Sequence, residues 1–64
     1  MAETLEVQIL NWCNSINFAI TQDEIDEAVI LVNSGNYTIP EAVEEILGFD
    51  PVNPPAGKER PLKP

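Results

Sequence analysis

Residues 21–48, TQDEIDEAVILVNSGNYTIPEAVEEILG, contain two helix-start signals and two helix-stop signals. Thr21-Gln22-Asp23-Glu24 and Thr38-Ile39-Pro40-Glu41 both match the capping box, in which a threonine hydroxyl and a glutamate carboxylate each accept a hydrogen bond from the other residue's backbone amide. Gly35 and Gly48 follow the two apolar runs and are typical of helix ends. The stretch therefore predicts two consecutive helices.

A further helix is predicted upstream, where apolar residues recur at three- and four-residue spacing and thus share one helical face. Thr4 is a suitable N-cap for it. The sequence therefore predicts an all-α protein, a small bundle of three helices. The expected bounds are Thr4–Ser15, Gln22–Ser34 and Ile39–Leu47. The expected core is Leu5, Ile9, Trp12, Ile16, Ile25, Ala28, Val29, Val32, Val43, Ile46 and Leu47.

The last part of the chain has a different composition. Residues 50–64 hold five of the six prolines, a density at which neither a helix nor a central strand forms. We expect a Pro-rich, extended and largely disordered C-terminal tail without a core of its own. The domain organisation predicted is an acidic helical domain over 1–49 and a flexible tail over 50–64.

Charge is distributed unevenly along the chain. The formal net charge is −8, and all three basic residues (Lys58, Arg60 and Lys63) lie in the last seven positions. Residues 1–57 carry −10. A body without a cation cannot neutralise phosphates, so direct binding to nucleic acid or to anionic lipid is not expected. A partner protein with a basic surface fits this charge, although acidity also serves solubility.

The sequence offers no recognisable active site. There is no histidine, and Cys13 is the only cysteine, so an internal disulfide and the usual zinc sites are excluded. Cys13 has no cation near it in sequence and is expected to be a small packing residue. The acids Asp23, Glu24, Asp26 and Glu27 are explained by helix capping and the helix dipole rather than by calcium binding. We expect no catalysis and no cofactor.

No targeting or membrane signal is visible in the chain. The N-terminus lacks a basic region followed by a long apolar run, and no stretch approaches the roughly 20 apolar residues that span a bilayer. The sequence therefore predicts a cytoplasmic protein with a reduced cysteine.

The segment Asp26–Gly48 resembles the opening of a helix-turn-helix domain. Ala28, Gly35-Asn36-Tyr37-Thr38-Ile39 and Ala42 echo its first two helices. The element that would enter the DNA groove falls in the Pro-rich tail, and no basic residue precedes Lys58. DNA binding is therefore not expected from this resemblance.

Residues 6–47 are similar to ubiquitin-associated domains, which are three-helix modules that bind ubiquitin. The similarity lies in Glu6-Val7-Gln8-Ile9, Asn17-Phe18 and Glu41-Ala42-Val43-Glu44-Glu45-Ile46-Leu47. Ile16-Asn17-Phe18 stands where that family has Met-Gly-Phe, and the middle connection is several residues longer. The resemblance implies binding of a ubiquitin-like partner.

These observations lead to three functional hypotheses. The first is an acidic protein-binding module or inhibitor that mimics DNA and occupies a basic groove of a partner, as compact phage-encoded factors do. The second is a structural subunit or homo-oligomer that buries Ile30, Leu31 and Tyr37, with the tail docking as an extended segment. The third is a ubiquitin-associated-like domain. The expected partner-binding residues are Asp23, Asp26, Glu27, Glu41, Glu44, Glu45, Tyr37 and Leu31.

Overall fold

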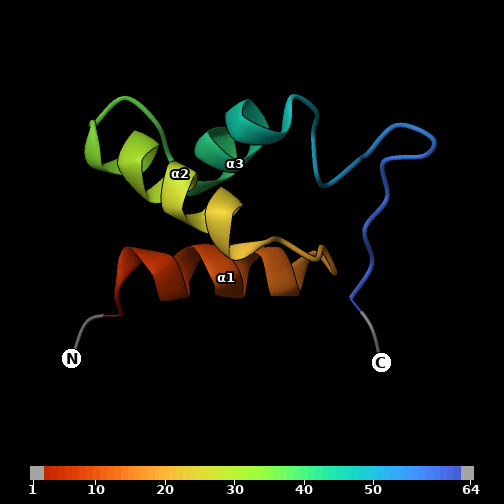
Figure 1. Ribbon diagram of the computed structural model, residues 1–64, viewed down its shortest axis with the longest axis horizontal. Helices are drawn as coiled ribbons and strands as arrows, with labels where there is room; N and C mark the ends of the chain where they lie inside the picture. The colour runs from red at the N-terminus through yellow and green to blue at the C-terminus, as the bar shows by residue number, and fades with distance from the viewer. Residues whose placement is uncertain (1–2, 63–64) are drawn as a thin grey trace.

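The computed structural model describes residues 3–62 and contains three α-helices, and no strand occurs in that range. The helices are α1 (Leu5–Ser15), α2 (Gln22–Asn33) and α3 (Ile39–Leu47). Helix α1 lies across one side of the pair formed by α2 and α3 (Figure 1), and α2 packs more extensively on α3 than on α1. The predicted three-helix bundle is confirmed, with α1 and α2 each one residue shorter than expected.

Both predicted capping boxes are present. The Thr21 hydroxyl accepts from the Glu24 amide at 3.3 Å, and the Glu24 carboxylate accepts from the Thr21 amide at 2.9 Å. The corresponding distances between Thr38 and Glu41 are 3.4 and 3.1 Å. Each box satisfies two backbone amides that a helix start would otherwise leave without partners. The local sequence thus determines where α2 and α3 begin.

Residues with a left-handed backbone conformation lie at or just after the ends of the helices. Gly48 caps α3 with φ = 80°, as the sequence predicted. Helix α2 ends at Asn33 with Ser34 as its cap, and Gly35 follows with φ = 86°. After α1, Asn17 adopts φ = 58°, a conformation that asparagine tolerates better than most residues. This turn directs the chain back toward α1, and the Phe18 amide donates to the Cys13 carbonyl at 2.9 Å.

The core is smaller than the sequence predicted. Among residues 3–62, the buried apolar residues are Ile9, Cys13, Phe18, Ile25, Ala28, Ala42 and Val43. Most of the other expected core residues pack against this cluster while staying partly exposed, namely Trp12, Ile16, Val29, Val32, Ile46 and Leu47. Leu5 is a correction, because it lies outside the cluster and lines a surface depression. In so short a chain the larger side chains reach the surface, since only a limited fraction of the chain's surface is buried.

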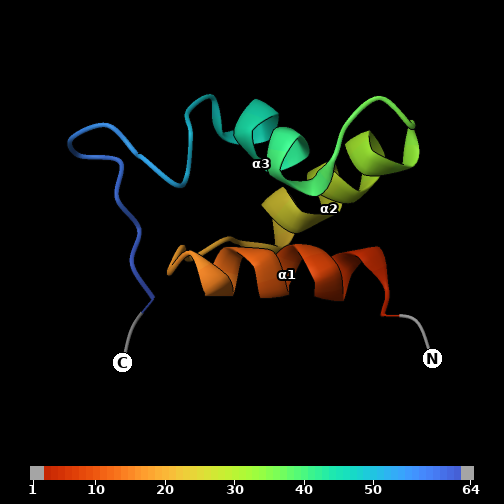
Figure 2. The same ribbon diagram turned by 180° about the vertical axis from the view of Figure 1, so that it is seen from behind.

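Beyond α3, residues 50–62 form neither helix nor strand. The segment leaves the end of α3, turns, and returns past the connection between α1 and α2 (Figure 2). Pro51 is buried, and the Ala19 amide donates to the Arg60 carbonyl at 2.7 Å. The extended, flexible and disordered character expected of the tail stays a prediction. Within residues 3–62, no helix is long and apolar enough to cross a membrane.

Candidate partner-binding surface

One face of α3 combines three carboxylates with an aromatic ring. Glu41, Glu44 and Glu45 are three and four positions apart, which places their side chains on one side of the helix. All three are exposed. Together with Tyr37 and Asn36, which precede the helix, they line an open depression of ≈ 270 Å³. We call these five residues the α3 face.

Glu41 has a structural role that accounts for its position. Its carboxylate accepts from the Thr38 backbone amide at 3.1 Å and from the Thr38 hydroxyl at 2.9 Å. These two hydrogen bonds lower the pKa of Glu41, because they favour the charged form. Glu41 is therefore an anion near neutral pH and adds its charge to the α3 face.

Glu44 and Glu45 have no comparable structural explanation. They lie in the second half of α3, near its negative end, where the helix dipole disfavours anions. The last turn of α3 has no basic residue, and like charges spaced by three or four positions along a helix are destabilising. Of the residues described, only Glu24 and Arg60 form an ion pair. The placement of Glu44 and Glu45 thus lowers the stability of the folded state.

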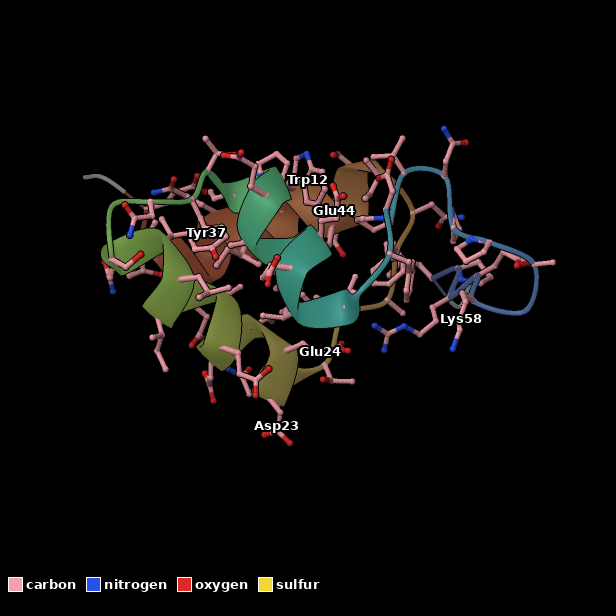
Figure 3. The ribbon with its side chains drawn as sticks, turned by 90° about the horizontal axis from the view of Figure 1, so that it is seen from above. Trp12, Asp23, Glu24, Tyr37, Glu44 and Lys58 are labelled. Atoms are coloured by element: carbon pink, nitrogen blue, oxygen red, sulfur yellow. The ribbon has the colours of Figure 1, made fainter. Side chains whose placement is uncertain are left out.

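The predicted acids of α2 lie elsewhere on the molecule. Asp23, Asp26 and Glu27 are exposed, and Asp23 lies at the lower edge of the molecule in Figure 3, well apart from Glu44 in the upper middle of that view. Asp26 accepts from the Gln22 side-chain amide at 3.0 Å, and the same amide donates to Glu6 at 3.2 Å. The six predicted acidic residues therefore form two separate groups, one on α2 and one on α3.

A second depression lies between α1 and α2. Its volume is ≈ 550 Å³, and its lining residues are Thr4, Leu5, Glu6, Asp26, Val29, Ile30 and Asn33. Ile30 is 68% exposed, the largest exposed fraction among the large apolar side chains from residue 3 to residue 62. Two predicted partner-binding residues, Leu31 and Tyr37, are partly buried and pack against the core. Ile30 is thus the principal exposed apolar residue of α2.

One specific interaction was not anticipated from the sequence. Nη2 of Arg60 donates to both carboxylate oxygens of Glu24, at 2.9 and 2.8 Å. The guanidinium carbon lies 4.6 Å from the centre of the Phe18 ring, within cation–π range. Partial burial tends to raise the pKa of Glu24, but hydrogen bonds from Arg60 and Thr21 outweigh it and lower the pKa.

Cys13 is a free cysteine in the core. Burial, with a further contribution from the negative charge of Glu24, raises the pKa of its thiol to about 11, although the charge of Arg60 opposes this shift. The thiol is therefore protonated near neutral pH, a state that does not favour reactivity. Within residues 3–62, no three potential metal ligands come together.

No family model, no curated protein and no solved structure matches this chain. The resemblances to helix-turn-helix and ubiquitin-associated domains stay predictions from the sequence segments that carry them. The function of the protein is therefore inferred from the chemistry of its own surface.

Proposed function

We propose that this chain is a small acidic protein-binding module that binds a basic surface of a partner protein through the α3 face. The observation that supports this proposal is the placement of Glu44 and Glu45, which are exposed, lie near the negative end of α3 and have no basic residue in the same helical turn. Acidic side chains in such positions cost stability. A partner that supplies cations would remove that cost.

The α3 face has the chemistry to bind arginine or lysine side chains. Carboxylates form charge-assisted hydrogen bonds with guanidinium groups, and a cation can also lie over the ring of Tyr37. The carboxylates of Glu41, Glu44 and Glu45 would take the place of phosphates in a nucleic-acid-binding groove. The acids of α2, Asp23, Asp26 and Glu27, add to the negative field that accelerates association with a basic partner. The module would thus act as an inhibitor of the DNA-mimic kind.

The experiment has two steps. The partner is first isolated by capture from the native host and identified by mass spectrometry. Its affinity is then measured for the wild type and for two double variants, Glu44→Gln/Glu45→Gln and Asp23→Asn/Glu27→Gln. Each variant loses two negative charges, so both weaken the long-range attraction to a basic partner equally.

The proposal predicts a larger loss of affinity for the Glu44→Gln/Glu45→Gln variant, by about tenfold or more if one or two charge-assisted hydrogen bonds are removed. Equal losses in the two double variants would mean that only the overall charge matters. That result would contradict a specific role for the α3 face.

A second candidate function rests on the exposure of Ile30. This side chain lies beside Leu5 and Val29 in the depression between α1 and α2, and a large exposed apolar residue is suited to a subunit interface. The chain would then be a structural subunit or a homo-oligomer. Ile30→Asp separates the two functions, because it should abolish an apolar assembly and leave binding at the α3 face intact.

We propose that the protein works without catalysis or a cofactor, in the cytoplasm, and without direct contact with nucleic acid. A ubiquitin-like partner is the alternative implied by the resemblance of residues 6–47. Titration with ubiquitin, followed by the amide NMR signals of the chain, tests that alternative directly.

A further inference from the structure

The connection between α1 and α2, together with Glu24 in the first turn of α2, forms a site that holds an arginine. Its components are Asn17, Phe18, Ala19 and Glu24, which we call the arginine socket. Glu24 accepts two hydrogen bonds from Arg60 at 2.9 and 2.8 Å, and the Phe18 ring lies 4.6 Å from the guanidinium carbon. Phe18 is itself held edge-on against Phe49, with ring centres 6.1 Å apart. The socket thus presents an anion and an aromatic face to one guanidinium group.

The socket also recognises the backbone around the arginine. The Ala19 amide donates to the Arg60 carbonyl at 2.7 Å, and the side-chain oxygen of Asn17 accepts from the Leu62 amide at 3.3 Å. Pro61 lies between Arg60 and Leu62. Its lack of a backbone amide has no cost, because the socket takes no hydrogen bond from that position. These contacts would recognise an extended segment in which arginine is followed by any residue, including proline, and then by a residue with a free backbone amide. They depend on no other side chain of the tail.

The tail segment before the arginine is joined to the body by few polar contacts. Among residues 51–59, the hydrogen bonds of Val52, Gly57 and Lys58 all run to partners within three positions in sequence. The Arg60 and Glu24 side chains remain 33% and 23% exposed, so water can replace their interaction at little cost. A hollow of ≈ 280 Å³ remains between the tail and the end of α3, lined in part by Ile46 and Leu47. The tail therefore leaves part of the space beside the end of α3 unfilled.

We propose that the arginine socket is a binding site for an extended arginine-containing segment of a partner protein, and that the tail is its exchangeable internal ligand. Charge complementarity favours a basic partner over a second copy of this chain, because a second copy brings its own net charge of −8. The socket is distinct from the α3 face, so this inference does not depend on the function proposed for that face.

The test uses the full chain and a synthetic peptide with the sequence of residues 57–64, GKERPLKP. The peptide is titrated against the wild type, in which the internal tail competes, and against Arg60→Ala, in which the tail lacks the guanidinium that binds Glu24 and Phe18. If the tail occupies the socket nine-tenths of the time, the peptide binds Arg60→Ala about tenfold more tightly than the wild type. Amide NMR signals of Asn17 and Ala19 should move on binding.

Further variants locate the bound peptide. In the Arg60→Ala background, Glu24→Gln should weaken binding about fivefold to tenfold, because it removes a partly exposed ion pair, whereas the charge-matched Glu6→Gln should leave binding unchanged. A peptide with alanine in place of its arginine should not bind. Far-UV circular dichroism checks that each variant keeps its helices.

Three results would overturn the inference. The first is the absence of peptide binding to a folded Arg60→Ala chain. The second is binding that Glu44→Gln abolishes and Glu24→Gln does not affect, which would place the peptide on the α3 face. The third is a tail-exchanged dimer of the wild type in sedimentation at high concentration, which would assign the socket to a second copy.

Discussion

Nη2 of Arg60 lies 2.9 and 2.8 Å from the two carboxylate oxygens of Glu24, a residue 36 positions earlier in the chain. The same carboxylate accepts from the Thr21 amide and caps α2. Glu24 thus joins the start of α2 to the end of the Pro-rich segment. Because Arg60 also covers Phe18, which is 2% exposed, this one contact links a helix cap, the core and the tail.

Arg60→Ala should lower the free energy of unfolding by about 1 kcal/mol. A partly exposed ion pair contributes only about 0.2–1 kcal/mol, and the loss of cover over Phe18 adds to this. Lys58→Ala is the matched control, since Lys58 is exposed and should change stability by less than about 0.5 kcal/mol. Urea unfolding followed by circular dichroism measures both. Equal stability of the two variants would show that Arg60 contributes nothing to the fold.

Thr38→Ala should destabilise the protein by about 1 kcal/mol, because it removes the hydroxyl that accepts from the Glu41 amide. In a domain of this size, that loss lowers Tm by about 4–8 °C. Thr38→Ser keeps the hydroxyl and should remain close to the wild type. The cap would be unimportant if both variants had the same Tm.

The pH dependence of stability should report the cap of α3. The hydrogen bonds from Thr38 lower the pKa of Glu41 below its ordinary 4.5. A carboxylate with a lowered pKa stabilises the folded state above its unfolded pKa, and this contribution is lost as the pH falls through the folded pKa. The stability difference between the wild type and Glu41→Gln should therefore be present at neutral pH and shrink below pH 4.5. A difference that grows on acidification would contradict the assignment.

Core and surface isoleucines should respond differently to truncation. Ile9 is fully buried, so Ile9→Ala should cost about 2–5 kcal/mol. Most of the side chain of Ile30 is in water, so Ile30→Ala should change stability by less than about 0.5 kcal/mol. Thermal unfolding at several protein concentrations compares the two. A concentration-dependent loss of stability in Ile30→Ala would instead indicate an apolar assembly.

Cys13 should react with thiol reagents only when the protein opens. Its side chain is buried and the pKa of its thiol is about 11, so little thiolate is present near neutral pH. Labelling with an aromatic disulfide reagent should be slow in buffer and rapid in denaturing urea. Rapid labelling of the native protein would show that the socket region opens frequently, because Cys13 and Phe18 belong to the same core cluster.

The elements with local determinants were predictable from the sequence. Thr21 and Thr38 start their helices where the capping boxes predicted, because the partners of each box are only three positions apart. The left-handed cap at Gly48 was predictable for the same reason. Interactions between residues only a few positions apart produce a recognisable sequence pattern, so the helices could be inferred without any tertiary information.

The composition of the core and the position of the tail depend on contacts between residues that are far apart in the sequence, and no local sequence pattern indicates such contacts. Phe18 lies in a connection rather than on a helical face, so helical periodicity does not place it in the expected core. The pairing of Arg60 with Glu24 joins residues 36 positions apart, and the sequence has no spacing rule for such a contact. The separation of Glu44 from Asp23 likewise follows from how α2 and α3 pack (Figure 3). Charge composition predicted the amount of negative charge but not its division between two surfaces.

The salt dependence of partner binding tests the proposed function most directly. Attraction between the exposed carboxylates and a basic partner is screened as the Debye length falls from about 10 Å at 0.1 M salt to about 3 Å at 1 M. The affinity of the captured partner for the wild type should therefore fall by about tenfold or more over this range. An affinity that stays constant from low to high salt would contradict recognition through the acidic surface.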